Sequence, residues 1–146
     1  MANADALRSA IASMDDVADL LDLVCTWQTW APTYSASGSM TYGTVTTNFA
    51  RYIKVGQLVI FQLSATGTTG GSAATQIRAT LPATASTAMG ASAAFYAQYV
   101  DGGSPLTGVG YLESTTLLGV TKADVTNWGT GSGRVIRCVG IYESAT

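Results

Sequence analysis

Hydrophobic residues recur at helical spacing only over the first 25 residues of the chain. One apolar position follows another every three or four residues there, and this spacing predicts a single amphipathic α-helix over residues 1–26. Its apolar stripe covers close to half the circumference, more than the seam of a two-stranded coiled coil. We therefore expect either a three-stranded bundle or a helix laid on the body of its own domain. The residues expected at the contact are Leu7, Ile11, Met14, Val17, Leu21 and Val24.

After residue 26 the period of the pattern changes to two. Short apolar runs separated by Gly, Ser and Thr predict strands at 40–47, 50–55, 58–65, 75–81, 92–100, 109–114, 116–121 and 133–143. Residues 27–34 have the composition of an aromatic-rich linker, and residues 64–75 that of a flexible hairpin tip. Seven or eight such strands favour an antiparallel β-sandwich of jelly-roll type over residues 27–146.

Two of the predicted strands, over residues 58–63 and 135–141, are apolar on both of their faces. The opposite sheet of a sandwich covers one face of a strand, so the other face needs a further apolar surface. We expect another copy of the same chain to supply that surface.

The composition favours one folded domain with few charges. The chain has 146 residues, of which 47% are hydrophobic and 11% charged, and this excludes a disordered chain. The net charge of -2 without clustered Lys and Arg disfavours nucleic acid as a partner. Five Asp and one Arg make the first 25 residues acidic. The N-terminus lacks the pattern of a signal peptide and no run reaches the ~18 apolar residues of a membrane span, so no membrane partner is expected.

Histidine is absent, which removes the commonest general base, the commonest metal ligand and every triad that uses imidazole. Cys25 and Cys138 stand far apart without CxxC spacing, so neither a metal site nor a cofactor is predicted. They form either two buried thiols, which the usual burial of free cysteine favours, or a disulfide. The acidic residues of the body stand singly, whereas glycoside hydrolysis needs two carboxylates across one bond. No catalytic residue is predicted, and we expect the chain not to be an enzyme.

Aromatic residues interleaved with small polar ones are the remaining candidates for chemistry. An aromatic ring can hold the apolar face of a sugar while nearby polar groups bind its hydroxyls. Aromatic residues of a β-sandwich are more often core than ligand platforms. The polar, Gly-flanked stretch 124–133 is expected to form an exposed loop, and a second strand end precedes Gly102. The predicted ligand-binding residues are Trp128, Asn127, Tyr99, Asp101 and Asp124.

Two stretches of the chain resemble a known group of proteins. Residues 37–45 (SGSMTYGTV) followed by 47–59 (TNFARYIKVGQLV) resemble the opening of C-terminal head domains in tailed-phage fibre, tail-tip and related virion proteins. Residues 134–142, which end in GIY, resemble the close of such domains. The resemblance covers about residues 27–143 and contains no catalytic signature. It implies a jelly-roll sandwich assembled as a homotrimer, with an N-terminal helix that links it to the particle.

The resemblance implies a bacteriophage virion protein, made in the host cytoplasm and carried on the particle surface. It would bind host surface polysaccharide through loops at the outer end of the trimer. Because the chain has no fibre shaft, the alternative is a capsid or tail decoration protein with no ligand of its own. Buried loop aromatics and a contact surface on the N-terminal helix would favour this alternative. In both cases the helix is expected to bind other virion proteins. A monomeric carbohydrate-binding module unrelated to virions is a third hypothesis.

Overall fold

The structure is a computed structural model in which residues 25–145 are described, without the side chains of residues 90–92. The described residues form one nine-stranded sheet. The strands are β1 (Gln28–Thr29), β2 (Tyr34–Ala36), β3 (Met40–Val55), β4 (Leu58–Gly71), β5 (Gln76–Thr80), β6 (Ala94–Val100), β7 (Leu106–Leu112), β8 (Leu117–Lys122) and β9 (Gly131–Glu143). A 3-10 turn, η1 (Thr87–Ser92), connects β5 to β6.

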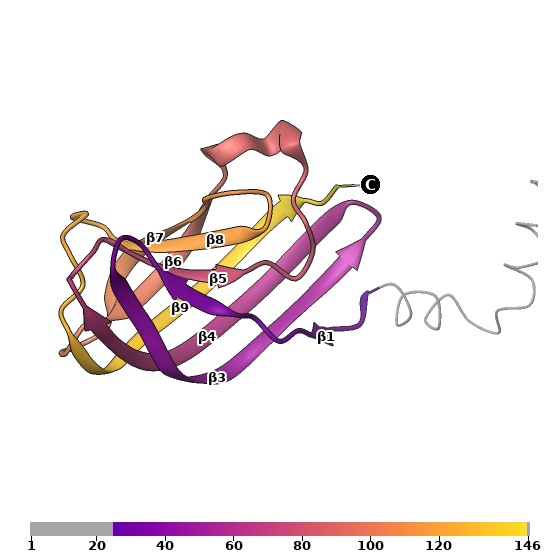
Figure 1. The fold of residues 1–146 in the computed structure, drawn as a ribbon. Coiled ribbons are helices and arrows are strands. Elements are labelled where there is room, and N and C mark those ends of the chain that lie inside the picture. Colours follow the sequence, from indigo (N-terminus) through magenta and orange to yellow (C-terminus); the bar gives the residue numbers. More distant parts are fainter. Residues whose placement is uncertain (1–24, 146) are drawn as a thin grey trace, which may run out of the picture.

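All neighbouring strands are antiparallel, in the order β1-β3-β4-β9-β6-β7-β8-β5-β2 (Figure 1). The prediction of a mainly β, antiparallel domain is therefore confirmed. The predicted helix over residues 1–26 lies, except for its last two residues, outside the described part of the chain.

The sheet curls until its two edges approach each other. β2 lies at one edge and β3 next to the other, yet the rings of Tyr34 and Tyr42 are only 6.0 Å apart between centroids. The hydroxyl of Tyr34 also lies 2.8 Å from Oγ1 of Thr47. Figure 1 shows the strands wrapped around a common interior, with β3 and β4 along one side and β7 and β8 along the other. One continuous sheet thus supplies both sides of the core.

The long hairpin of β3 and β4 differs from the prediction. Residues 40–47 and 50–55 belong to one strand, which continues through two irregularities in register between residues 43 and 49. Residues 64–71, expected at a flexible tip, continue β4. Gly67 shows the physical reason, because a Cβ there would lie 2.7 Å from the ring of Tyr42. Small residues in this stretch serve close packing, which composition alone does not distinguish from flexibility.

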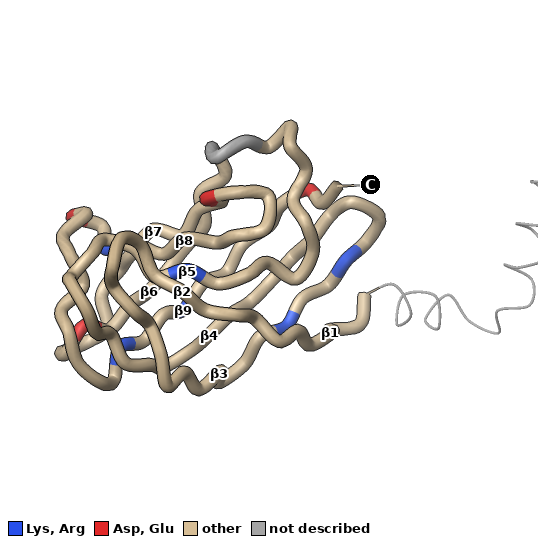
Figure 2. The backbone as a smooth tube through the Cα atoms, viewed as in Figure 1, with Lys and Arg blue, Asp and Glu red and all other residues tan. Residues whose placement is uncertain are grey.

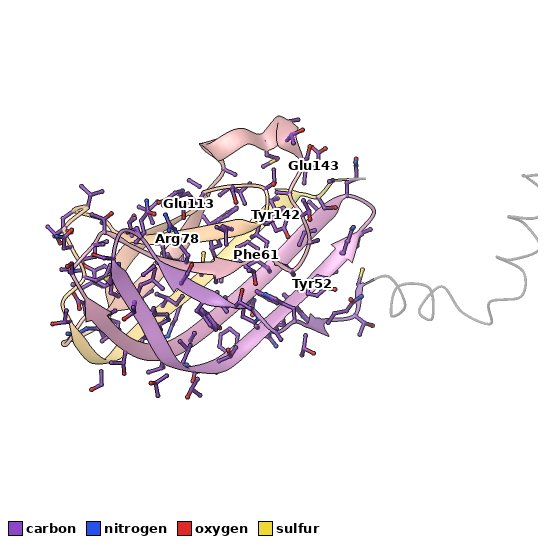
Figure 3. The ribbon with its side chains drawn as sticks, in the orientation of Figure 1. Tyr52, Phe61, Arg78, Glu113, Tyr142 and Glu143 are labelled. Carbon is purple, nitrogen blue, oxygen red and sulfur yellow. The ribbon has the colours of Figure 1, made fainter. Side chains whose placement is uncertain are left out.

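Side chains on the concave side of the sheet form the core. The ring of Phe61 packs edge-on against Phe95 and Tyr142, with centroids 5.2 and 5.9 Å apart. Figure 3 shows Phe61 and Tyr142 between the two sides of the curled sheet. The hydroxyl of Tyr142 donates to the carbonyl of Ala83 at 2.7 Å, so this buried phenol keeps a partner. In β5, Ile77 and Ala79 point inward as predicted.

The strand order β9-β6-β7-β8 is a Greek key, in which the fourth strand returns beside the first. The returning connection is the loop of residues 123–130 between β8 and β9. This loop therefore crosses the end of β6. Two short strands were not predicted: β1 lies inside the stretch 27–34 expected as a linker, and β2 begins at the last residue of that stretch. They are edge strands too short for a period of two to show in the sequence.

Candidate functional site

The ends of β6 and β8 meet the starts of β7 and β9 at one end of the sheet. Antiparallel pairing places Tyr99 opposite Leu106, Lys122 opposite Gly108 and Val100 opposite Val135. A shallow hollow of about 320 Å³ opens there. Its main lining residues are Tyr99, Asp101, Ser104, Leu106, Lys122, Asp124 and Thr126. Three of the five predicted ligand-binding residues therefore lie around one hollow.

Asp101 is the centre of the charges at this end. Its carboxylate forms ion pairs with Lys122 and with Arg134, whose Nε lies 2.9 Å from Oδ1. The backbone N–H of Gly129 donates to both carboxylate oxygens, at 3.1 and 3.0 Å. Each of the three charged side chains is 11% exposed. Figure 2 shows the blue and red positions close together at the end of the sheet where β9 begins.

The pKa of Asp101 reflects two opposing effects. Burial of the carboxylate raises the pKa, but hydrogen bonds from Lys122 and the Gly129 amide, with the positive charges of Lys122 and Arg134, outweigh burial and lower the pKa below its ordinary value. The carboxylate is therefore ionised at neutral pH. Its oxygens already accept bonds from three groups, so its first role is to hold the β8–β9 loop against β6.

Trp128 is buried, and the expectation of an exposed indole is wrong. Its side chain has 0% exposure and meets the ring of Tyr99 edge-on, with centroids 5.4 Å apart. Its backbone N–H donates to the carbonyl of Ala74 at 2.9 Å. The ammonium of Lys122 lies 6.0 Å from both ring centroids. The large apolar area of an indole explains its burial, and the ion pairs at Asp101 keep the loop closed over it.

Asp124 and Asn127 lie in the same loop and are exposed, as predicted. Oδ1 of Asp124 accepts hydrogen bonds from the backbone N–H and the hydroxyl of Thr126, at 3.1 and 2.8 Å. Asn127 contributes its backbone carbonyl, which accepts a hydrogen bond from the Lys122 ammonium. Val125, between them, has a φ of 50°, a left-handed conformation that is uncommon for a β-branched residue. The loop is thus held at both ends while Val125 is 69% exposed.

Two carboxyl groups line the hollow, and the pKa of each is lowered. The hydrogen bond from the Thr126 hydroxyl lowers the pKa of Asp124, and the contacts above lower that of Asp101. A general acid at neutral pH requires a carboxyl group with a raised pKa. Both carboxyl groups are instead ionised. Asp101 already has three partners, so Asp124 is the carboxylate that can bind hydroxyl or cationic groups.

Sequence reasoning missed Lys122 and Arg134, which complete this cluster. Each stands next to the predicted loop 124–133, in a part of the chain that has few charges. This position could have indicated that the two residues pair with a carboxylate at the loop. A charge at the end of an apolar strand needs a partner, because burial of an unpaired charge is unfavourable. The partner, Asp101, is 21 and 33 positions away in the chain.

Both cysteines of the chain are free thiols. Cys138 is buried, as expected, and burial raises the pKa of its thiol to about 12. Cys25 is exposed, whereas the favoured prediction was a buried thiol. It lies before the first strand and therefore outside the core of the sheet. Residues 25–145 contain no group of three or more side chains that could hold a metal ion. Across the same residues, no helix has the length and hydrophobicity needed to cross a membrane.

Comparison of the chain with protein-family models, with curated proteins and with solved structures finds no match. The function is therefore inferred from the geometry of the domain and from the resemblance in sequence pattern.

Proposed function

We propose that this protein is a structural subunit of a bacteriophage particle. It is a homotrimeric fibre-head or decoration module of jelly-roll type, displayed on the virion surface and joined to other virion proteins through its N-terminal segment. It is not an enzyme in this proposal. The strand order β9-β6-β7-β8 supports the jelly-roll assignment, because jelly rolls are built from Greek keys.

The observation that carries the proposal is the distribution of apolar side chains. Trp128 and Tyr99, which would bind a sugar if exposed, are buried. Most of the large apolar side chains that are exposed are aliphatic, among them Leu58, Val139 and Ile141 at 47%, 45% and 57%, and the exposed rings of Phe49 and Tyr96 lie on the sheet and not on the predicted binding loops. Exposed aliphatic side chains on a sheet favour contacts between proteins over contacts with sugars. This distribution favours the decoration hypothesis over receptor binding.

The first test is the mass of the protein in solution, measured by light scattering coupled to size exclusion. Three copies of the 15.0 kDa chain have a mass of about 45 kDa, which is the expected result. Leu21→Asp, which places a charge in the apolar stripe, is expected to release monomers or to aggregate, whereas Asp19→Asn is the matched control. A monomeric wild-type protein would contradict the proposal and favour a stand-alone carbohydrate-binding module.

The particle assignment has a separate test. Mass spectrometry of purified particles, made from the genome that encodes this chain, is expected to detect the protein. Antibodies against residues 27–146 are expected to label the outside of those particles in electron micrographs. Absence of the protein from particles that contain all other structural proteins would refute the assignment.

Binding of host surface polysaccharide is the second candidate function, and the hollow beside Asp124 favours it. Ionised carboxylates accept hydrogen bonds from sugar hydroxyls, and Leu106 offers an apolar wall that is 55% exposed. A screen against host polysaccharides should then give binding that Asp124→Asn weakens and that Glu143→Gln, away from the hollow, leaves unchanged. Equal binding by both variants would exclude the hollow as the site.

A further inference from the structure

The convex side of the sheet exposes an apolar surface across β4, β9 and β6, which we call the outer face. Ile141 pairs with Ile60 of β4, and Val139 pairs with Tyr96 of β6. The side chains of Tyr96, Val139 and Ile141 are 62%, 45% and 57% exposed. A groove of about 230 Å³ lies beside them and is lined in part by Phe49. Adjacent apolar groups of this kind are normally covered by a partner.

The outer face also carries two arginines that lack carboxylate partners among residues 25–145. Arg51 donates from Nε and Nη2 to Oε1 of Gln62, at 2.9 and 2.7 Å. Arg137 donates from Nη1 to Oε1 of Gln98 at 2.7 Å. By contrast, three other cations each pair with a carboxylate, and these are Arg78, Lys122 and Arg134. Figure 3 shows the first of these pairs, Arg78 with Glu113. Glu143 is the one carboxylate exposed on this side of β4, β9 and β6, so the outer face is apolar with a small excess of positive charge.

The segment of residues 1–24 has the complementary composition. It combines the apolar stripe described above with five Asp against one Arg. The chain enters the described domain beside the outer face, since the guanidinium of Arg51 lies 4.8 Å from the ring centroid of Trp27. In β1, Thr29 pairs with Arg51. The segment is thus attached at the edge of the surface that it complements.

The segment is long enough to cover this surface. A helix of 24 residues spans about 36 Å at 1.5 Å per residue. The three strand spacings from β3 to β6 cover only about 14 Å. Covalent attachment also gives the segment an effective concentration of about millimolar at the surface.

A second copy of the chain fits the outer face less well. Contact between the outer faces of two copies would bury four arginines, whereas β4, β9 and β6 offer only Glu143 of each copy as a carboxylate on that face. Like charges placed together are unfavourable, particularly when a contact removes water. The charges therefore favour the acidic segment as the group that covers this face.

We propose that residues 1–24 dock on the outer face of their own chain. Their apolar stripe covers Tyr96, Val139 and Ile141. Asp15 and Asp22 flank that stripe at helical spacing and lie near Arg51 and Arg137, whereas Asp5, Asp16 and Asp19 face solvent. The stripe is wider than one contact requires, so its remaining apolar positions, in place of the covered Val139 and Ile141, contact neighbouring copies. Docking is consequently compatible with the trimer of the proposed function but does not depend on it.

Disulfide cross-linking of the full chain tests this docking. In a Cys25→Ser background, Leu21→Cys is combined with Val139→Cys, and in a second variant Val17→Cys is combined with Tyr96→Cys. Both outer-face positions are exposed, so the substitutions are compatible with folding. The control combines Leu21→Cys with Gly103→Cys, a loop position where an added Cβ meets no atom within 4 Å. Cys138 stays buried and does not compete.

Mild oxidation is expected to link at least one outer-face pair within a single chain, tenfold or more faster than the control pair and independently of protein concentration. Arg51→Gln combined with Arg137→Gln, or 1 M NaCl, should slow the reaction severalfold. Equal rates for test and control pairs, or products that join two chains, would overturn the docking. The solution mass of the unlinked protein is measured in parallel. A monomer that cross-links refutes only the trimer, and a trimer that fails to cross-link refutes only the docking.

Discussion

Asp101→Asn tests whether the ion pairs at the end of the sheet hold the β8–β9 loop. The substitution removes one negative charge from between Lys122 and Arg134, each of which is 11% exposed. Loss of one partner from a buried ion pair destabilises a protein by about 3–5 kcal/mol, because the remaining charge stays buried without compensation. The Asn carbonyl still accepts a hydrogen bond from the Gly129 amide, so we expect a loss near the lower end, about 3 kcal/mol.

Urea unfolding followed by tryptophan fluorescence measures this loss, because the buried Trp128 lies in the loop that Asp101 holds. Protein concentration is kept constant, since association contributes to stability. Asp124→Asn is the matched control, because it removes the same charge from an exposed position of the same loop and should leave the stability nearly unchanged. A loss below about 1 kcal/mol in Asp101→Asn would refute the role of the cluster.

We also expect the stability difference between wild type and Asp101→Asn to depend on pH. The pKa of Asp101 is lower in the folded protein than its ordinary value of 3.8. Its carboxylate therefore stabilises the fold above that ordinary value, and this contribution disappears as the pH falls through the folded pKa. The difference in unfolding free energy between wild type and Asp101→Asn should be constant near neutral pH and shrink below about pH 4. A difference that stays constant down to pH 2 would contradict the assignment.

Two further predictions concern the core. Gly140→Ala should destabilise the protein by about 1–3 kcal/mol, because a Cβ there would lie 2.5 Å from the ring of Phe95 and 2.6 Å from that of Phe61. Thermal unfolding measures this loss of stability. The control is Gly103→Ala, where an added Cβ meets no atom within 4 Å and the melting temperature should not change. The Cys25 thiol should react with a thiol reagent at pH 8 in the native protein, whereas Cys138, whose burial raises its pKa to about 12, should react only after unfolding. Rapid labelling of Cys138 in the native protein would show that the core opens near β9.

The sequence predicted strands well wherever one face of the strand is buried. In β5, Ile77 and Ala79 alternate with half-buried polar residues, and the predicted inward positions are correct. The expectation of a flexible tip failed for residues 64–71, of which the predicted strand 58–65 already included the first two; small residues there form the second half of β4. Gly67 is small because the Tyr42 ring lies against it, and Tyr42 is 25 positions away. A composition of Gly, Ser and Thr does not separate a tightly packed strand from a flexible loop.

The candidate site was predicted only in part, for a related reason. Tyr99 and Asp101 were correctly placed at a strand end, and Asp124 and Asn127 on a loop. Polarity and flanking glycines identify loops, but they do not indicate which side chains the loop buries. Trp128 lies between exposed Asn127 and half-buried Gly129, and its burial depends on contacts with Tyr99 and Ala74.

The sequence by itself determined the fold class, the existence of seven of the nine strands in some form and the lack of imidazole chemistry. These properties depend on residue types and on spacings of two to four positions, which are local. Only the tertiary structure decided the curl of the sheet, the Greek-key order and the meeting of Asp101 with Lys122 and Arg134. It also decided that Trp128 and Tyr99 are buried while Tyr96, Val139 and Ile141 are exposed. Each of these depends on pairing between strands distant in the chain, and the free energy that selects such pairing comes from burial over the whole domain.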